Sequence, residues 1–315
     1  MNPNKPEDGT GDTGAMTSSE MTVILEFGRS NPMPDEERVE DRRITAEGML
    51  LGPLAEGTAA EVAPLGGRPA LWIRRVAASE SDDRVILYLH GGAFEVGSPR
   101  EYQAFCSTLA QRLRATVVVP DYRLAPEHPF PAAVEDVTAA YGGLLDAGHP
   151  ATSLALIGDS AGGGLVMSCL LTARRDGLPQ PAVAVALSAW ADLTLGSDSH
   201  RRCKETDPFI RTAMLRRAAD HYLAGTDPRH PSASPAHAPP EELADLAPVL
   251  LQAAANEVLA DDSVTVAERI TAAGGEVTLE LCPEAFHVWP LAGPDVPESD
   301  QALESLTRFV CSRCL

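Results

Sequence analysis

Lysine is almost absent from the chain, because only Lys5 and Lys204 occur among its 315 residues. The 25 basic residues are therefore nearly all arginine, and 45 acidic residues outnumber them, which leaves a formal net charge of −20. Nucleic acids and anionic membrane surfaces are polyanions, so this balance argues against both as partners. It places no such limit on a small-molecule substrate.

Long apolar runs are also absent, and none reaches the roughly 18 residues that a membrane-spanning helix needs. The first 20 residues are acidic and lack the apolar segment of a secretory signal, and we expect a disordered tail there. The six cysteines are scattered, several of them inside apolar runs where cysteine behaves as a small core residue. These features favour a reducing, cytoplasmic location. The pair Cys311 and Cys314 has no second ligand pair, so no metal or redox centre is expected from it.

Short apolar segments alternate with segments of helical periodicity through most of the chain. We expect strands at 70–76, 85–89, 116–120, 154–158, 182–188, 248–254 and 276–282, and helices at 101–114, 131–146, 161–175, 264–273 and 298–313. Continuously apolar strands separated by amphipathic helices favour a mostly parallel sheet covered by helices on both faces. The predicted class is α/β, with one domain over residues 21–315.

Residues 189–245 interrupt this alternation. They contain no strand pattern and include the proline-rich stretch DPRHPSASPAHAPPEE, and they are too long for an ordinary loop. We expect a helical cap above the carboxyl ends of the strands. The segment at about 21–50, which contains a charged helical stretch, is assigned to the same cap.

The sequence GDSAGGG at 158–164 is the strongest functional signal. It follows an apolar strand and opens a helical run, which is the setting of a nucleophile elbow with the pattern G-x-S-x-G. Gly158 and Gly162 permit the sharp turn that presents the Ser160 hydroxyl, and the N–H of Ala161 begins the helix beside it. A glycine-rich phosphate loop is the alternative, but such a loop requires a lysine, and none is near.

A second motif, YLHGGAFEVGS at 88–98, directly follows another expected strand. Acyl transfer builds negative charge on a carbonyl oxygen, and backbone N–H groups are suitable fixed donors for it. Gly91 and Gly92 allow close backbone approach, and Ala93 is a possible third donor. His90 is interpreted as a structural side chain rather than the catalytic base.

One of the eight histidines has the position expected of a base. His287 lies in CPEAFHVWPLAG, just after the last expected strand, where the chain order Ser, acid, His would place it. A partly buried packing histidine is the alternative interpretation. His200, His221, His230 and His237 fall in the expected cap.

Taken together, these motifs resemble those of the bacterial hormone-sensitive-lipase-like esterases of the α/β-hydrolase fold. The resemblance rests on HGGAF (90–94), DYRLAPEHPFPAAVED (121–136), GDSAGG (158–163), LSAWADL (187–193) and FHVWPLAG (286–293). It implies carboxylic ester hydrolysis under a helical cap, without metal or cofactor. It also implies Ser160 as nucleophile, His287 as base, and Gly91, Gly92 and Ala161 as oxyanion hole.

The stretch DYRLAPEHPFP also contains Asp121, Glu127 and His128, which together could suggest a metal cluster. The resemblance and the prolines both favour a rigid turn that supports the sheet edge. No ligand set with the spacing of a metal site is found elsewhere.

The triad acid is the point where the sequence departs from the commoner family form. Many relatives carry D-P-L-x-D where this chain reads EVLADD at 257–262. Alignment through Leu259 places Glu257 at the position of the catalytic Asp, in the first turn after an apolar strand. Asp261 and Asp262 adjoin the following helix, where we expect one of them to serve as N-cap.

The sequence therefore predicts a serine esterase with a Ser160–His287–Glu257 triad that acts on short-chain acyl or aryl esters. Two alternatives stay open at this point. One is a deacetylase or lactonase for a specific metabolite, and the other is a non-catalytic binding protein with the same fold. The expected partner is a small-molecule ester, with a homodimer as an open possibility.

Overall fold

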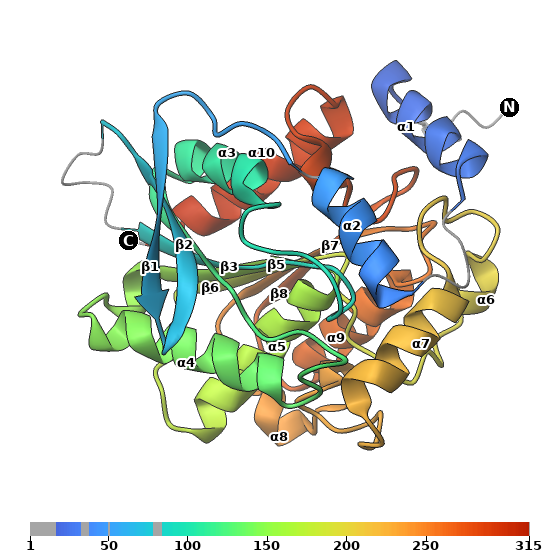
Figure 1. The fold of residues 1–315 in the computed structure, drawn as a ribbon. Coiled ribbons are helices and arrows are strands. Elements are labelled where there is room, and N and C mark those ends of the chain that lie inside the picture. Colours follow the sequence, from blue (N-terminus) through green and yellow to red (C-terminus); the bar gives the residue numbers. More distant parts are fainter. Residues whose placement is uncertain (1–16, 33–37, 50, 78–83, 315) are drawn as a thin grey trace, which may run out of the picture.

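The computed structural model describes residues 17–32, 38–49, 51–77 and 84–314 (Figure 1). Its described part contains one sheet of eight strands in the order β1-β2-β4-β3-β5-β6-β7-β8. The strands are β1 (Thr58–Leu65), β2 (Arg68–Arg75), β3 (Arg84–Leu89), β4 (Ala115–Pro120), β5 (Leu154–Asp159), β6 (Val183–Leu187), β7 (Val249–Ala254) and β8 (Val277–Cys282). From β4 to β8 in this order all neighbours are parallel, whereas β2 is antiparallel to both β1 and β4.

Helices cover both faces of the sheet, as the continuously apolar strands require. On one face α3 (Gln103–Leu113) and α10 (Pro297–Cys311) pack against side chains such as Ile86 and Val117 (Figure 1). On the other face lie α4 (Ala132–Asp146), α5 (Ala161–Arg175) and α9 (Ala260–Ala272), which pack against Leu87 and Leu156. The buried strands β3, β5, β6 and β7 are accordingly mostly apolar, and the polar exception Gln252 in β7 donates its side-chain amide to the Ala302 carbonyl of α10. This is the α/β-hydrolase fold that the sequence predicts.

The seven predicted strands are all present, and one more strand precedes them. β1 was not predicted, because its sequence TAAEVAPL leaves most side chains exposed at the edge of the sheet and shows no continuous apolar run. The helix α9 begins at Ala260 rather than at 264.

The predicted disordered tail is wrong at its carboxyl end. Helix α1 spans Ser19–Ser30, and the Ser18 hydroxyl caps it by accepting the N–H of Met21. Both the N–H and the hydroxyl of Ser18 donate to Glu298 at the start of α10, which fixes this end of α1 to the core domain. Residues 1–16 lie outside the described residues.

Between β6 and β7 the described chain is helical or irregular, with α6 (Ser199–Arg202), α7 (Thr212–Leu223), η2 (Pro235–His237) and α8 (Pro240–Leu243). Helix α2 (Val39–Met49) lies beside α7 in Figure 1, although the two are far apart in sequence. The sequence assigns these segments, together with the rest of about 21–50, to a cap. We refer to α2 and residues 189–245 as the cap segments.

Candidate active site

Ser160 lies at the sharp turn between β5 and α5. Its φ and ψ of 52° and −121° fall outside the regions that a non-glycine residue favours, so the surrounding packing has to hold it. A Cβ on Gly158 would come within 2.5 Å of the Gly162 carbonyl oxygen, and one on Gly162 within 2.0 Å of the Leu89 oxygen. Both glycines are therefore required by close backbone contact, which is the local reason why this sequence forms an elbow.

Three side chains from separate loops form a continuous hydrogen-bonded chain at the carboxyl edge of the sheet. His287 Nε2 lies 2.9 Å from Ser160 Oγ, and His287 Nδ1 lies 2.7 Å from Glu257 Oε2. All three side chains belong to buried residues, with exposed fractions of 8% for Ser160, 7% for His287 and 1% for Glu257. The arrangement has the geometry of a nucleophile, a base and an orienting acid.

Glu257 is fixed in place by the turn after β7. Its second carboxylate oxygen, Oε1, accepts the N–H of Ala254 at 3.2 Å. The next residue along, Val258, donates its N–H to the carboxylate of Asp207, a buried side chain from the cap segments, at 2.9 Å. A residue of the cap segments thus supports the loop that carries Glu257.

The environment of His287 favours the protonated imidazole. Burial alone would lower its pKa, but the charge and hydrogen bond of Glu257, assisted by the charges of Asp207 and Asp159, outweigh burial and raise the pKa above its ordinary value. A base of raised pKa accepts a proton from a serine hydroxyl more readily, provided that it is neutral beforehand.

One of the three predicted oxyanion donors is not free in the structure. Gly91 was expected to supply a donor, but its N–H points to Asp159 Oδ1 at 3.0 Å and to the Tyr102 hydroxyl at 3.1 Å. An N–H already bound to a buried carboxylate is not free for a substrate oxygen. The N–H groups of Gly92, Ala93 and Ala161 have no partner among the described residues, and these are the available donors.

Asp159 supports the loop that carries these donors. Its carboxylate accepts the hydroxyls of Tyr88 at 2.7 Å and Tyr102 at 3.1 Å in addition to the Gly91 N–H. Burial raises the pKa of Asp159 to about 6, although the two tyrosines and the positive charge of His287 oppose that rise. The carboxylate therefore contacts the loop at 91–95, which we call the oxyanion loop, and Asp159 directly precedes Ser160 in the chain. No pattern in the sequence indicated this role.

His90 is structural, as the sequence suggests. Its ring stacks on Tyr122 with centroids 4.2 Å apart, and Nδ1–H donates to the Gly91 carbonyl at 2.8 Å. Burial lowers the pKa of His90 to about 4, although the bond to the Gly91 carbonyl opposes this. The side chain is therefore neutral at neutral pH, and the histidine bonded to Ser160 is His287.

Comparisons with known proteins place the chain in a family. The alpha/beta hydrolase fold family matches residues 86–291. An acetyl-hydrolase from Streptomyces hygroscopicus is 42% identical over 301 residues, which cover 94% of this chain and 97% of that protein. The crystal structure of an esterase from the bacterial hormone-sensitive lipase family superposes with a TM-score of 0.89 at 37% identity, covering 95% of this chain and 100% of that one. The chain belongs to the bacterial hormone-sensitive-lipase-like esterases.

The esterase is similar over its whole fold to a further solved structure, that of EstE5 soaked with p-nitrophenyl butyrate. The TM-score is 0.88 at 37% identity, and the match covers 94% of this chain and 98% of that chain. Together with the named esterases among its relatives, this likeness makes the protein a serine carboxylesterase, a hydrolase of carboxylic esters.

Asp261 and Asp262 of the esterase do not cap α9, which corrects the prediction made for them. The N-cap is Leu259, without a side-chain cap, and both aspartates lie in the first turn of the helix. Asp262 Oδ2 accepts the N–H groups of Ala191 and Asp192, each at 2.9 Å. Asp261 accepts the Ser199 N–H at 2.8 Å and pairs with Arg202. Both carboxylates fasten the cap segments to the core instead.

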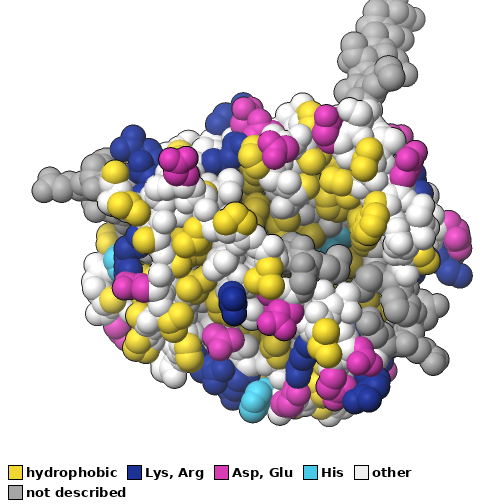
Figure 2. Space-filling view, turned by 45° about the horizontal axis from the view of Figure 1, so that its top comes forward, with side chains coloured by type: hydrophobic (Ala, Val, Ile, Leu, Met, Phe, Trp, Pro, Cys, Tyr) yellow, Lys and Arg dark blue, Asp and Glu magenta, His cyan; other side chains and the backbone are white. Residues whose placement is uncertain are grey.

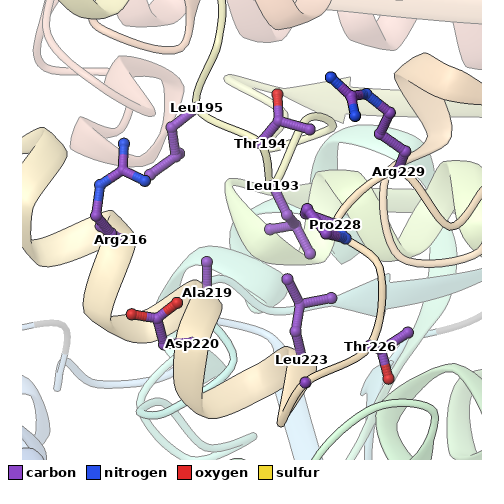
Figure 3. Close-up of a pocket in the computed structure, with 11 residues that line it drawn as sticks. Leu193, Thr194, Leu195, Arg216, Ala219, Asp220, Leu223, Thr226, Pro228 and Arg229 are labelled. Atoms are coloured by element: carbon purple, nitrogen blue, oxygen red, sulfur yellow. The ribbon is translucent and has the colours of Figure 1, made fainter.

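A cavity of about 360 Å³ lies in the cap segments of the esterase, lined by the carboxyl-terminal half of α7 and the loops around it (Figure 3). Leu193, Leu195, Ala219 and Leu223 form its apolar part, and the side chains of Arg216 and Arg229 stand on opposite sides of it in Figure 3. It contains no residue of the triad or of the oxyanion loop, so it is distinct from the reaction site.

The molecular surface combines apolar and charged areas. In Figure 2 apolar side chains gather in the middle of the face shown, around a hollow in which a histidine is visible, and charged side chains lie mostly toward its rim. Val23 and Phe27 on α1 are 64% and 60% exposed.

No helix in the described part of the chain is long and apolar enough to cross a membrane. Within the same residues, no three His, Cys, Asp or Glu side chains are grouped so as to hold a metal ion.

Proposed function

We propose that the esterase hydrolyses short-chain acyl or aryl esters through a Ser160–His287–Glu257 triad and an acyl-enzyme. The observation that carries this proposal is the unbroken hydrogen-bonded chain from Glu257 Oε2 through both nitrogens of His287 to Ser160 Oγ. Glu257 takes the role that is commonly filled by aspartate. Its side chain is one methylene longer than that of aspartate, and its carboxylate makes the corresponding hydrogen bond to the imidazole.

The reaction divides into two halves with the same proton path. Ser160 Oγ attacks the ester carbonyl while His287 Nε2 accepts its proton, and the tetrahedral oxyanion binds the N–H groups of Gly92, Ala93 and Ala161. His287 then gives the proton to the leaving alcohol, which leaves an ester bond between the acyl group and Ser160. Water attacks this acyl-enzyme with His287 again as base, and the carboxylic acid is released.

A small acyl group fits the packing around the nucleophile. Trp190 donates its backbone N–H to the Ser160 carbonyl. The centroid of its ring lies 5.5 Å from that of Phe94, the residue after Ala93. Phe94 in turn stacks on Tyr222 of α7 with centroids 3.8 Å apart. These three rings are buried, and we infer that they limit the room for a long acyl chain next to the oxyanion donors.

A deacetylase acting on a specific small metabolite is the second candidate. The observation that favours it is the acetyl-hydrolase of Streptomyces hygroscopicus, whose 42% identity extends over 94% of this chain. Both candidates use the same residues and differ only in the alcohol part of the substrate. A panel of esters that varies acyl length, acetylated alcohols and lactone ring size would separate them.

The direct test of the mechanism is Ser160→Ala. Because Ser160 is the nucleophile in this proposal, the variant is expected to retain less than about 1/1000 of the wild-type kcat on an aryl acetate, with an unchanged melting temperature. A phosphonylating reagent is expected to add once to the wild type and not to the variant. If Ser160→Ala keeps a tenth of the wild-type kcat, the proposed triad is wrong.

A further inference from the structure

Glu95 is a buried acidic side chain within the loop that carries two of the proposed oxyanion donors. It follows Ala93 by two residues in HGGAFEVGS, and its side chain is 0% exposed. A buried carboxylate destabilises a protein unless it is paired with cations or hydrogen-bond donors. The triad makes no use of Glu95, so the groups that hold it are informative.

Each carboxylate oxygen of Glu95 is held by a different cap element. Oε2 accepts a hydrogen bond from the guanidinium of Arg42 on α2, whose side chain is only 6% exposed. Oε1 accepts one from His221 Nδ1 on α7 at 2.5 Å. Glu95 is thus the point at which the two cap segments and the oxyanion loop meet, which is consistent with the closeness of α2 and α7 in Figure 1.

The backbone of Glu95 also forms hydrogen bonds both to the oxyanion loop and to α2. Its N–H donates to the Gly92 carbonyl at 3.0 Å and closes the turn that contains the donors, and its carbonyl accepts Arg43 Nε at 2.8 Å. Arg43 also donates to the Ala125 carbonyl at 3.1 Å and pairs with Glu127. Two neighbouring arginines of α2 therefore hold the side chain and the main chain of one residue.

The backbone of this loop adopts conformations that its own residues do not favour. Gly92, Ala93 and Phe94 have φ values of 113°, 54° and 62°, and the last two are left-handed conformations that non-glycine residues rarely adopt. Such conformations persist only where surrounding contacts determine them. A loop released from its contacts would turn its peptide planes and move the N–H groups of Gly92 and Ala93 away from the substrate.

We propose that Glu95 is a positioning residue that couples the oxyanion hole to the cap segments. With Arg42 and His221 both in place, its carboxylate fixes the loop so that the N–H groups of Gly92 and Ala93 face the reacting carbonyl. When α2 or α7 moves away, the carboxylate loses a partner and the donors lose their alignment. This inference rests on the proposed function, since it concerns the donors of the same reaction.

The experiment removes each partner of the Glu95 carboxylate separately, and active-site titration with a phosphonate gives kcat per active site. Arg42→Met and His221→Phe are each expected to lower kcat by about 10- to 100-fold, the range for loss of oxyanion stabilisation, with KM changed less than about threefold. Arg42→Lys is expected to recover part of the loss, because it restores a cation. Arg38→Gln is the matched control, because Arg38 forms an exposed ion pair with Glu40 just before α2, and no change is expected.

Two inhibitors distinguish a role of Glu95 in positioning the oxyanion donors from a general disturbance of the active site. A trifluoromethyl ketone is attacked by Ser160, and the hemiketal oxyanion that forms occupies the oxyanion hole, whereas the matching methyl ketone binds without that bond. The proposal predicts that Arg42→Met weakens the trifluoromethyl ketone by about the same factor as kcat and the methyl ketone by less than about twofold. Equal weakening of both inhibitors would overturn the positioning role.

Coupling through one side chain is tested by a double-mutant cycle. Arg42→Met leaves the Glu95 charge buried without its main partner, and Glu95→Gln removes that charge. In the Glu95→Gln background, Arg42→Met is therefore expected to cost less than about twofold in kcat, far below its cost alone. If Arg42→Met, His221→Phe and Glu95→Gln keep the wild-type kcat per titrated site and only melt at lower temperature, the proposal is wrong. In that case an inactive Ser160→Ala would still support the triad. An active Ser160→Ala would instead defeat the triad itself.

Discussion

Glu257 and His287 meet through one short contact, 2.7 Å between Oε2 and Nδ1, from loops that follow two adjacent strands, β7 and β8. Because neighbouring parallel strands end at the same edge of a sheet, the proposed acid and base are brought together by topology rather than by closeness in sequence. The other oxygen of Glu257 is held by the Ala254 N–H, so the carboxylate has a single orientation toward the imidazole.

This contact predicts which of three nearby carboxylates is the triad acid. Glu257→Ala is expected to lower kcat by about 10³- to 10⁴-fold, as loss of a triad acid does, and Glu257→Asp to retain partial activity because the charge remains with shorter reach. Asp261→Ala is the matched control, because its carboxylate binds Ser199 and Arg202 instead, and its kcat is expected to stay within about twofold of wild type. An inactive Asp261→Ala beside an active Glu257→Ala would show that the acid is misassigned.

The raised pKa of His287 predicts the pH dependence of the esterase. His287 must be neutral to accept the Ser160 proton, so kcat/KM is expected to rise with pH through a pKa above the ordinary histidine value of about 6.5. Glu257→Gln removes the charge that favours the imidazolium, so the midpoint of its residual activity is expected at lower pH. A pH profile measured for both proteins on one aryl ester checks this, and an unshifted midpoint would contradict the role of Glu257.

Asp262 predicts a pH-dependent stability that is unrelated to catalysis. Burial, reinforced by the charge of Asp192, raises its pKa well above the ordinary value, although the N–H groups of Asp192 and Ala191 and the Ser197 hydroxyl oppose this. The folded pKa thus exceeds the unfolded pKa, so the contribution of this group is fully present below the unfolded pKa and is lost as pH rises through the folded one.

The test compares two substitutions at this position. Asp262→Asn keeps an oxygen for the N–H groups of Ala191 and Asp192 and cannot ionise, so its advantage over wild type is expected to grow with rising pH. Asp262→Ala leaves those N–H groups unpaired and is expected to cost about 2 kcal/mol of unfolding free energy. Chemical denaturation at several pH values measures both. A wild-type stability that rises in parallel with that of the Asn variant would contradict the argument.

The buried rings of Phe94, Trp190 and Tyr222 predict a preference for short acyl groups. Acetyl to hexanoyl aryl esters are expected to be hydrolysed well, and a C16 ester at least about tenfold more slowly, since each misfitting group costs on the order of 1 kcal/mol. Tyr222→Ala opens space beside Phe94 and is expected to shift the optimum toward longer chains. Equal wild-type turnover of acetyl and C16 esters would contradict a closed acyl site.

Much of the fold could be predicted from the sequence because its determinants are local. The seven predicted strands are mostly apolar runs, and Gly158 and Gly162 mark the elbow by their position around Ser160. Strand β1 was missed because its apolar and polar side chains do not alternate, although Gly66-Gly67 between it and β2 is a typical hairpin turn.

The errors in the site arise where the choice depends on tertiary contacts. Sequence alone does not tell which of several consecutive N–H groups faces the substrate, and the structure turns that of Gly91 toward Asp159. Likewise, an aspartate in the first turn of a helix resembles an N-cap until the cap segments supply the N–H groups that it binds. Glu95 did leave a signal, an acidic residue between Phe94 and Val96 in an otherwise apolar loop, which indicates a buried ion pair.

The close backbone contacts of the elbow also bear on how such an enzyme can change its substrate. A Cβ on Gly164 would lie 2.2 Å from the Trp190 carbonyl oxygen, so even the smallest side chain at this first turn of α5 would displace the chain that leads into the cap segments. The glycines of the elbow therefore tolerate no side chain. New specificities, whether natural or engineered, are expected to arise from those cap side chains that contact neither Ser160 nor the loops of Glu95 and Glu257.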